Sequence, residues 1–271
     1  MAYPELKVFT YSYLRVIICI MTTERPHEGI TSPSISHWLR EAYTTIYSSG
    51  DIPDSPDHSR LLMAQLIAKY LVSSQVEPTT ILDLGAGNQN VEKTLQMLSY
   101  SAAGRGKYAK LKGKLATTQV VALDIASCPI KRKPYWTKPL ESDSAAIPLR
   151  NESVDLVVSN HSVDMLRRNP DDFNTALGEV HRVLRPGGTV ILNLHHASLY
   201  NNLCEFFQAR NPASPSAQYY NPNAHNPFFE DALSIENELA RVALLTQSVN
   251  LEKDNYDNWW CVTAQKAPTS N

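Results

Sequence analysis

The chain has 271 residues, of which 43% are hydrophobic, and a formal net charge of −2 at pH 7. That length fits one large α/β domain or two small ones, with enough apolar residues for a sizeable core. The slight negative charge argues against a protein that coats nucleic acid. Four cysteines lie far apart in the sequence: Cys19, Cys128, Cys204 and Cys261. Their spacing disfavours a zinc site or a disulfide framework and fits a reducing compartment, so we expect a cytoplasmic protein without a metal site.

An apolar run, Tyr11–Ile20, lies near the N-terminus with Arg15 in its middle. It is too short to span a membrane, and no small-residue cleavage site follows it, as a signal peptide requires. The run could be an extra strand or helix, a disordered lead, or sequence upstream of a true start at Met21, and we favour the start at Met21. We assign residues 1–57 to an N-terminal lead with a cap helix and residues 58–271 to the main domain.

Helices are predicted from apolar residues spaced three or four apart, and strands from short apolar runs. In chain order these elements are helices 33–49 and 58–73, strand 80–84, helix 91–100, strand 120–124, a strand within 152–159, helix 170–184, strand 189–194, helix 228–245, and strands 248–251 and 259–266. Residues 104–114 and 131–138 are basic and indicate surface loops. Residues 195–227 contain three Asn-Pro pairs and are predicted to be irregular. The alternation of strands with helices predicts an α/β protein.

The segment Ile81-Leu82-Asp83-Leu84-Gly85-Ala86-Gly87-Asn88 is the most informative in the chain. An apolar strand leads into a turn with two glycines, where the backbone can turn tightly and approach a nucleotide closely. Amides at the start of the following helix would face that ligand. Pairs of glycines also serve packing alone, so this segment by itself leaves both interpretations open.

The second apolar strand, Val120–Leu123, ends in Asp124. A carboxylate at that point can accept hydrogen bonds from both hydroxyls of a ribose, although an aspartate there can also cap the next turn. Three further motifs follow along the chain: Asp143–Leu149, Glu152–Ser159 and Leu184–Gly188, which reads Leu-Arg-Pro-Gly-Gly.

In this order and spacing, the motifs resemble the class I S-adenosylmethionine-dependent methyltransferases over about residues 60–266. They look most like the small-molecule branch that includes the quinone-biosynthesis methyltransferases. The resemblance implies a doubly wound α/β fold, with a mostly parallel seven-stranded sheet and an antiparallel last strand inserted into it, which is the Rossmann-like methyltransferase fold. It also implies S-adenosyl-L-methionine as the cofactor and a small-molecule acceptor.

The resemblance further implies which residues bind the cofactor. The Asp83–Gly87 turn would line its amino-acid end, Asp124 would bind the ribose, and Asp143 would bind the adenine amino group with a backbone amide of Ser144 or Ala145. The full implied set is Asp83, Gly85, Ala86, Gly87, Asp124, Ile125, Asp143, Ser144 and Asn160.

His161 follows the fourth strand, at the edge where open α/β sheets bind ligands. It could act as a general base, since imidazole titrates near neutral pH, or it could pack on the cofactor or cap the next helix. His195 and His196 end the fifth strand and point to opposite sides, so one of them could also face the acceptor. We expect the acceptor between the N-terminal helices, the segment Asn160–Val163 and a lid-like insertion at about 197–227.

A dehydrogenase on the same layer architecture is disfavoured by the Leu-Arg-Pro-Gly-Gly motif and the terminal Trp259-Trp260 strand. Two other alternative functions stay open. An RNA or protein methyltransferase could dock its substrate on the basic stretches, and a non-catalytic S-adenosylmethionine-binding protein would keep the glycines and the acid. Nucleic-acid amino-methyltransferases carry an Asn-Pro-Pro-aromatic turn directly after the fourth strand. This chain has Asn160-His161 there, and its Asn226-Pro227-Phe228 comes much later, so methylation of DNA adenine is not supported.

Overall fold

The computed structural model of the chain describes residues 58–74, 79–87, 90–101, 110–125, 137–168, 170–210, 223, 226–253 and 258–268. The predicted helix 33–49, the start at Met21 and most of the two basic stretches lie outside these residues. Within them, no helix is long and apolar enough to cross a membrane.

Seven strands form one sheet in the order β3-β2-β1-β4-β5-β7-β6. Their bounds are β1 Thr80–Leu84, β2 Gln119–Asp124, β3 Thr137–Glu141, β4 Val154–Asn160, β5 Leu184–His195, β6 Leu244–Lys253 and β7 Asn258–Lys266. Strands β1 to β5 run parallel, whereas β7 pairs antiparallel with both β5 and β6. The predicted sheet is therefore confirmed, including the antiparallel last strand inserted into it.

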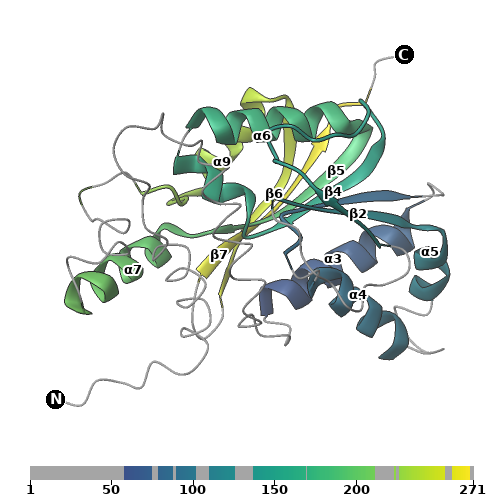
Figure 1. Cartoon of the computed structure of the whole chain (residues 1–271), viewed down its shortest axis with the longest axis horizontal. Coiled ribbons are helices and arrows are strands. Elements are labelled where there is room, and N and C mark those ends of the chain that lie inside the picture. The colour runs from purple at the N-terminus through teal and green to yellow at the C-terminus, as the bar shows by residue number, and fades with distance from the viewer. Residues whose placement is uncertain are drawn as a thin grey trace.

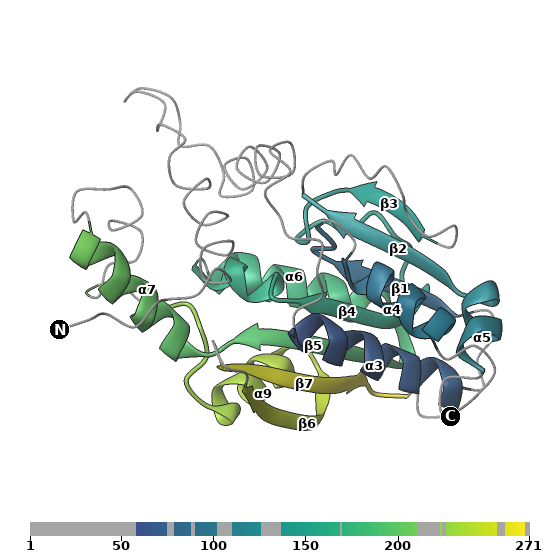
Figure 2. The same cartoon turned by 90° about the horizontal axis from the view of Figure 1, so that it is seen from below.

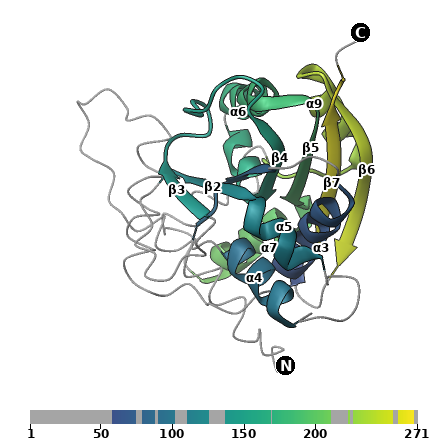
Figure 3. The same ribbon diagram turned by 90° about the vertical axis from the view of Figure 1, so that its right-hand side faces the viewer.

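Helices cover both faces of the sheet (Figure 1). Their bounds are α3 His58–Ser73, α4 Asn90–Ser101, α5 Leu111–Thr117, the short 3-10 helix η1 Val163–Arg168, α6 Pro170–Val183, α7 Ala197–Arg210 and α9 Ala232–Arg241. Helices α6 and α9 lie on one face and α3, α4 and α5 on the other (Figure 3). Helix α7 follows the carboxyl end of β5 and extends beyond the sheet (Figure 2).

Two apolar cores form because side chains alternate between the two faces of each strand. In β1, Ile81 packs with α3, α4 and α5, whereas Leu82 packs with α6 and α9. In β2, Val120 and Val121 divide between the cores in the same way. Strands that are buried on both faces read as nearly continuous apolar runs, which is why these four strands were visible in the sequence: β1, β2, β4 and β5.

The prediction of an irregular segment from residue 195 onward is wrong for residues 197–210, which form α7. Three buried residues on this helix, Ala197, Tyr200 and Cys204, are spaced three and four apart. That spacing places them on one face, so packing against the rest of the molecule favours a helix. Residues 211–222 of the predicted lid lie outside the described part of the chain.

Three short elements were missed, and one of them is η1. Thr137–Glu141 forms β3, which pairs only with β2 at the edge of the sheet; Pro139 weakened the strand signal because proline is tolerated in strands mainly at edges. Helix α5 begins at Leu111, inside the basic stretch 104–114 that was predicted to be a loop. The burial of Leu111 and Leu115 stabilises this helix.

Candidate functional site

The carboxyl ends of the parallel strands meet along one edge of the sheet. Strand β1 lies between β2 and β4, so the chain winds away from β1 in both directions. Open α/β sheets bind ligands at such a switch point. The glycine turn after β1, Asp124 at the end of β2, Asn160 at the end of β4 and His195 at the end of β5 all lie at this edge.

The turn after β1 is fastened to β2 by its own amides. Gly85 and Gly87 have positive φ angles of 76° and 52°, a region that glycine adopts without steric cost. The amides of Gly85 and Ala86 donate to the carbonyl of Leu123 at 2.8 and 2.9 Å, and the amide of Gly87 donates to Asp124 Oδ2 at 2.8 Å. These three amides are therefore hydrogen-bonded within the protein, and the bond from Gly87 places the Asp124 carboxylate beside the turn.

The segment after β4 lies directly against the same turn. A Cβ added to Gly85 would stand 1.7 Å from the Oγ of Ser162. Only glycine permits this approach, so it joins the Asn160–Ser162 segment to the glycine turn at the switch point. Ser162 was not among the predicted cofactor-binding residues, although it belongs to the segment Asn160–Val163 that was predicted to face the acceptor.

Asp83 is buried rather than exposed at the turn. Its side chain is 2% exposed and lines a small apolar cavity together with Glu92 of α4 and residues of β1, β2, β4 and α3. Apart from their contact with each other, Asp83 Oδ2 and both carboxyl oxygens of Glu92 have no hydrogen-bond partner among the described residues. Burial raises the pKa of Asp83 to about 7 and the pKa of Glu92 well above its usual range, where the charge of Asp83 adds to the shift. The pair therefore binds a proton near neutral pH.

Asp143 lies on the loop that follows β3. Its Oδ1 accepts a hydrogen bond from the amide of Ala145 at 2.9 Å, so the carboxylate caps its own turn as well as lying near the edge of the sheet. The Ala145 amide is thereby occupied, which leaves the Ser144 amide as the backbone donor that the prediction requires.

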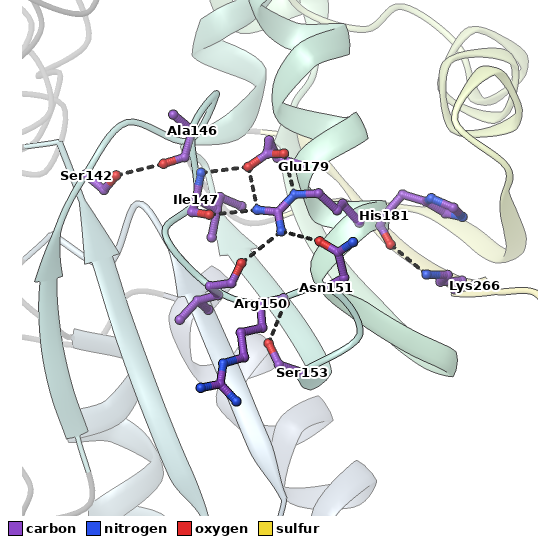
Figure 4. A network of polar contacts seen from close by, with 11 residues as sticks. Ser142, Ala146, Ile147, Arg150, Asn151, Ser153, Glu179, His181 and Lys266 are labelled. Atoms are coloured by element: carbon purple, nitrogen blue, oxygen red, sulfur yellow. Dashed lines mark hydrogen bonds and ion pairs between the residues drawn. The ribbon is translucent and has the colours of Figure 1, made fainter.

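Two residues of α6, Glu179 and Arg182, hold the loop that carries Asp143, and we call them the clamp. Glu179 accepts from the amide of Ile147 at 2.9 Å, as Figure 4 shows. Arg182 donates to both carboxylate oxygens of Glu179, to the carbonyls of Ile147 and Leu149, and to Asn151 Oδ1, at 2.6–2.8 Å. The residues Glu179 and Arg182 were missed, although their spacing on a predicted helix just before Leu-Arg-Pro-Gly-Gly was a usable signal.

The end of β4 is linked to α3 and β5. Asn193, which is fully buried, donates from Nδ2 to Asn160 Oδ1 at 2.8 Å and to the carbonyl of Ser59 at 3.1 Å. The start of α3 therefore lies at the edge of the sheet beside Asn160. The side-chain oxygen of Asn160 is already occupied in this contact.

His161 belongs to a buried cluster with His195 and Asp164. Asp164 Oδ2 accepts hydrogen bonds from the backbone amide of His195 at 2.6 Å and from its ring Nδ1 at 2.9 Å. The ring of His195 stacks on Phe228, with centroids 4.7 Å apart, and lies tilted against the ring of His161, with centroids 4.5 Å apart. His161 itself is only partly buried and has a φ of 56°. The strand ends thus bring both histidines together, as their positions predicted, and η1 supplies a carboxylate that was not predicted.

The ionisation of this cluster follows from its burial. Burial lowers the pKa of His161 well below its usual range, the nearby His195 and Arg60 lower it further, and Asp164 partly opposes them. Burial would raise the pKa of Asp164, but the charge and hydrogen bonds of His195 and the charge of His161 lower it overall. At neutral pH the structure therefore favours a neutral His161 beside an ionised Asp164.

His196 has a different role. Its Nδ1 accepts from the amide of Ser198 at 3.1 Å and lies 2.8 Å from the Ser198 hydroxyl. These contacts are at the first turn of α7, so His196 fixes the start of that helix.

Comparisons with known proteins agree with this architecture. A family model described as a methyltransferase domain matches residues 100–192, which include β2 to β4 and most of β5 but not the glycine turn. No curated protein sequence matches the chain.

Solved structures show the same fold at low sequence identity. A 1,6-didemethyltoxoflavin-N1-methyltransferase from Burkholderia thailandensis, with bound 1,6-didemethyltoxoflavin and S-adenosylhomocysteine, has a TM-score of 0.56 at 13% identity and covers 89% of this chain and 94% of its own. Magnesium protoporphyrin IX methyltransferase from Synechocystis PCC 6803, with bound S-adenosylhomocysteine, has a TM-score of 0.55 at 10% identity, with coverage of 86% and 100%. An S-adenosylmethionine-dependent methyltransferase from Methanosarcina mazei has a TM-score of 0.52 at 16% identity, with coverage of 75% and 98%.

The sheet order and these neighbours show that the chain has the fold of the S-adenosylmethionine-dependent methyltransferases, and the family model matches a methyltransferase domain over residues 100–192.

Proposed function

We propose that this protein transfers a methyl group from S-adenosylmethionine to a small-molecule acceptor. The observation that carries the proposal is the contact between the glycine turn, Asp124 and the Asn160–Ser162 segment at the switch point of the sheet. The positive φ angles of Gly85 and Gly87 and the adjacent acid fit a nucleoside cofactor. When bound, the cofactor supplies a methyl group that is already activated on a sulfonium. The protein must then align donor and acceptor, which is worth roughly 7–11 kcal/mol in favourable cases.

In this proposal each residue at the edge of the sheet binds a different part of the cofactor. Asp124 accepts hydrogen bonds from the ribose hydroxyls, and Ile125 packs against the adenine. Asp143 accepts from the adenine amino group. Asn160, already oriented by its bond to Asn193, lies nearest the methionine end. Asp83 acts indirectly, because its buried side chain supports the strand from which the turn begins.

Two observations support a small molecule as the acceptor. The titles of two neighbours name small molecules, didemethyltoxoflavin and magnesium protoporphyrin IX. The motifs at Asp143–Leu149 and Leu184–Gly188 also resemble the branch that includes the quinone-biosynthesis methyltransferases. Docking of RNA or protein would depend on the basic stretches, which lie mostly outside the described residues. The reaction would take place in the cytoplasm, as the cysteine pattern predicts.

Titration calorimetry with S-adenosylmethionine and S-adenosylhomocysteine tests the proposal. We expect the Asp124→Ala variant to bind about 10–150 times more weakly, because a lost hydrogen bond to a charged group costs about 1.5–3 kcal/mol. Asp155→Ala is the matched control: Asp155 is buried near the opposite end of β4, where it accepts from the Thr80 amide and pairs with Arg185, both at 2.7 Å. It should lose stability but not affinity. A folded wild-type protein without affinity at millimolar cofactor would refute the proposal.

A further inference from the structure

We propose that Glu92, in its protonated form, donates a hydrogen bond to Asp83 and thereby positions the glycine turn for the cofactor. The inference rests on the proposed function, because it assumes that S-adenosylmethionine binds at that turn. It makes Glu92 a positioning residue, which acts on the cofactor through Asp83 and the turn, and it gives a function to a buried pair of carboxyl groups.

The two carboxyl groups connect the segments on either side of the turn. Asp83 is on β1, two residues before Gly85, and Glu92 is in the first turn of α4, five residues after Gly87. Both side chains line the same small cavity and are hydrogen-bonded to each other. The strand that enters the turn is therefore bonded to the helix that leaves it, and this bond holds the two ends of the turn together.

Burial requires that this bond contain a proton. Both residues are 2% exposed, and apart from their mutual contact Asp83 Oδ2 and both carboxyl oxygens of Glu92 have no partner among the described residues. Two carboxylates in contact and away from water cannot both be ionised, because their charges repel each other. One group must therefore carry a proton, and a protonated carboxyl group can donate it in a hydrogen bond to the other.

At neutral pH this proton belongs to Glu92. Burial raises the pKa of Asp83 to about 7, although its bond to Glu92 lowers it. Burial raises the pKa of Glu92 well above its usual range, and the charge of Asp83 and their hydrogen bond raise it further. As pH rises, Asp83 is therefore the first to ionise, and Glu92 keeps its proton and donates to a charged acceptor. Such bonds are roughly twice as strong as neutral ones.

Among the described residues, no positively charged side chain lines the cavity around the pair. The other walls come from α3, α4, β1, β2 and β4 and are apolar: Ile67, Ile81, Val91, Leu95, Val120 and Val158. Beyond burial, Asp124 at the end of β2 adds to the raised pKa of Asp83, whereas the backbone amide of Glu92 and the charge of Lys93 partly lower the pKa of Glu92. A second negative charge would have little compensation, so the pair retains its proton.

The turn between the two segments is closely packed. Gly85 and Gly87 adopt positive φ angles, Gly85 lies against Ser162, and the Gly87 amide donates to the Asp124 carboxylate at 2.8 Å. A shift of α4 away from β1 would disturb these contacts and move Asp124 from its proposed position at the ribose. Loss of the donor on Glu92 should therefore weaken cofactor binding.

Two substitutions of similar size test the role of this donor. In Glu92→Gln the side-chain amide can still donate to Asp83, whereas Glu92→Met has a similar length and no donor. Titration calorimetry at about pH 8 measures the affinity for S-adenosylhomocysteine. We expect Glu92→Gln to stay within about threefold of the wild type and Glu92→Met to bind about tenfold or more weakly, as the loss of a hydrogen bond to a charged group allows. Equal affinities of the two variants would overturn the proposal.

Glu236→Gln is the matched control for the change of charge. Glu236 is exposed on α9, which lies on the opposite face of the sheet from α4 (Figure 3), so this variant should bind S-adenosylhomocysteine as the wild type does. A loss of affinity equal to that of Glu92→Met would show that net charge determines binding, and would also overturn the proposal. A wild-type protein that does not bind the cofactor or its product at millimolar concentration would instead refute the proposed function, so the two failures are distinguishable.

A measurement on the wild type does not depend on the folding of any variant. Infrared spectroscopy detects the carbonyl band of a protonated carboxyl group, and above about pH 8, where Asp83 is ionised, this band should report Glu92. Because the bond within the pair and the cofactor favour each other, bound S-adenosylhomocysteine should raise the pH at which the band is lost. A purely structural bond would titrate at the same pH with and without the ligand. That result, or the absence of the band at about pH 8, would overturn the proposal.

Discussion

Removing the guanidinium of Arg182 should loosen the loop that carries Asp143. In Arg182→Ala the carbonyls of Ile147 and Leu149 lose their donors, and Glu179 loses its partner. A hydrogen bond to a charged group contributes about 1.5–3 kcal/mol when buried, and less where water replaces the lost partner. The side chains of Arg182 and Glu179 are 31% and 21% exposed, so solvent screens the ion pair and limits its contribution to at most about 1 kcal/mol. We expect a total loss of about 2 kcal/mol, because water can reach part of the freed groups.

For a domain of this size that loss corresponds to a decrease in Tm of roughly 4–8 °C. Thermal unfolding followed by circular dichroism measures it, and calorimetry with S-adenosylhomocysteine measures the effect on the loop. Cofactor affinity should fall as well, because Asp143 would no longer be held in place. Arg182→Lys should restore little, since a lysine cannot donate to several planar acceptors at once.

Arg241 offers a matched control. It forms an ion pair with Glu238 at the same helical spacing and at 2.9 Å, and its side chain is 64% exposed. Arg241→Ala should therefore change the stability by less than about 0.5 kcal/mol. Equal effects of Arg182→Ala and Arg241→Ala on Tm, or an unchanged cofactor affinity in Arg182→Ala, would show that the clamp does not position the loop.

Two further predictions concern the glycine turn and the buried carboxyl pair Asp83 and Glu92. Gly85→Ala should lower both Tm and cofactor affinity, because its Cβ would stand 1.7 Å from Ser162 Oγ at a φ of 76°. Adding Ser162→Gly should restore only part of the loss, since the strain at this φ remains at about 1–2 kcal/mol. Gly178→Ala within α6 is the control: no atom lies within 4 Å of its new Cβ, so this variant should be neutral or stabilising. The raised pKa values of Asp83, about 7, and Glu92 mean that the folded protein binds a proton more readily than the unfolded chain; their contribution to stability is complete below about pH 4 and is lost as pH rises through about 7. Tm should thus fall less between about pH 5 and 8 in Glu92→Gln than in the wild type, and parallel curves would contradict this assignment.

The sheet was predictable because its central strands are buried on both faces. Runs such as Val120–Leu123 and Val154–Ser159 have no competing helical pattern, and each of them borders a motif of known spacing. The helix 58–73 was predicted with its observed bounds because its apolar residues face α4, α5 and the sheet. Predictions based on the spacing of apolar residues within one element therefore agree with the structure.

The start of the helix predicted for residues 228–245 was placed too early. Helix α9 begins at Ala232, later than the predicted 228, because Asp231 accepts from the Ser234 amide at 2.7 Å and caps it. Phe229 precedes that cap, and its backbone is instead engaged with His195 and Ala197. The apolar residues before Ala232 were interpreted as part of the helix, but they pack against the end of β5.

The candidate site shows the same division between local and long-range information. Strand ends and glycines are local features, so the predicted positions of Asp124, Asn160 and His161 at one edge of the sheet followed from the order of the elements. What those side chains do at that edge depends on partners that local patterns do not reveal. Asp164 and His195 are separated by 31 residues and Asn193 and Ser59 by 134, and no local periodicity relates such pairs. The ionisation of His161 depends on these contacts, because its ring lies 4.5 Å from that of His195, which is bonded to the buried Asp164, and because burial lowers its pKa.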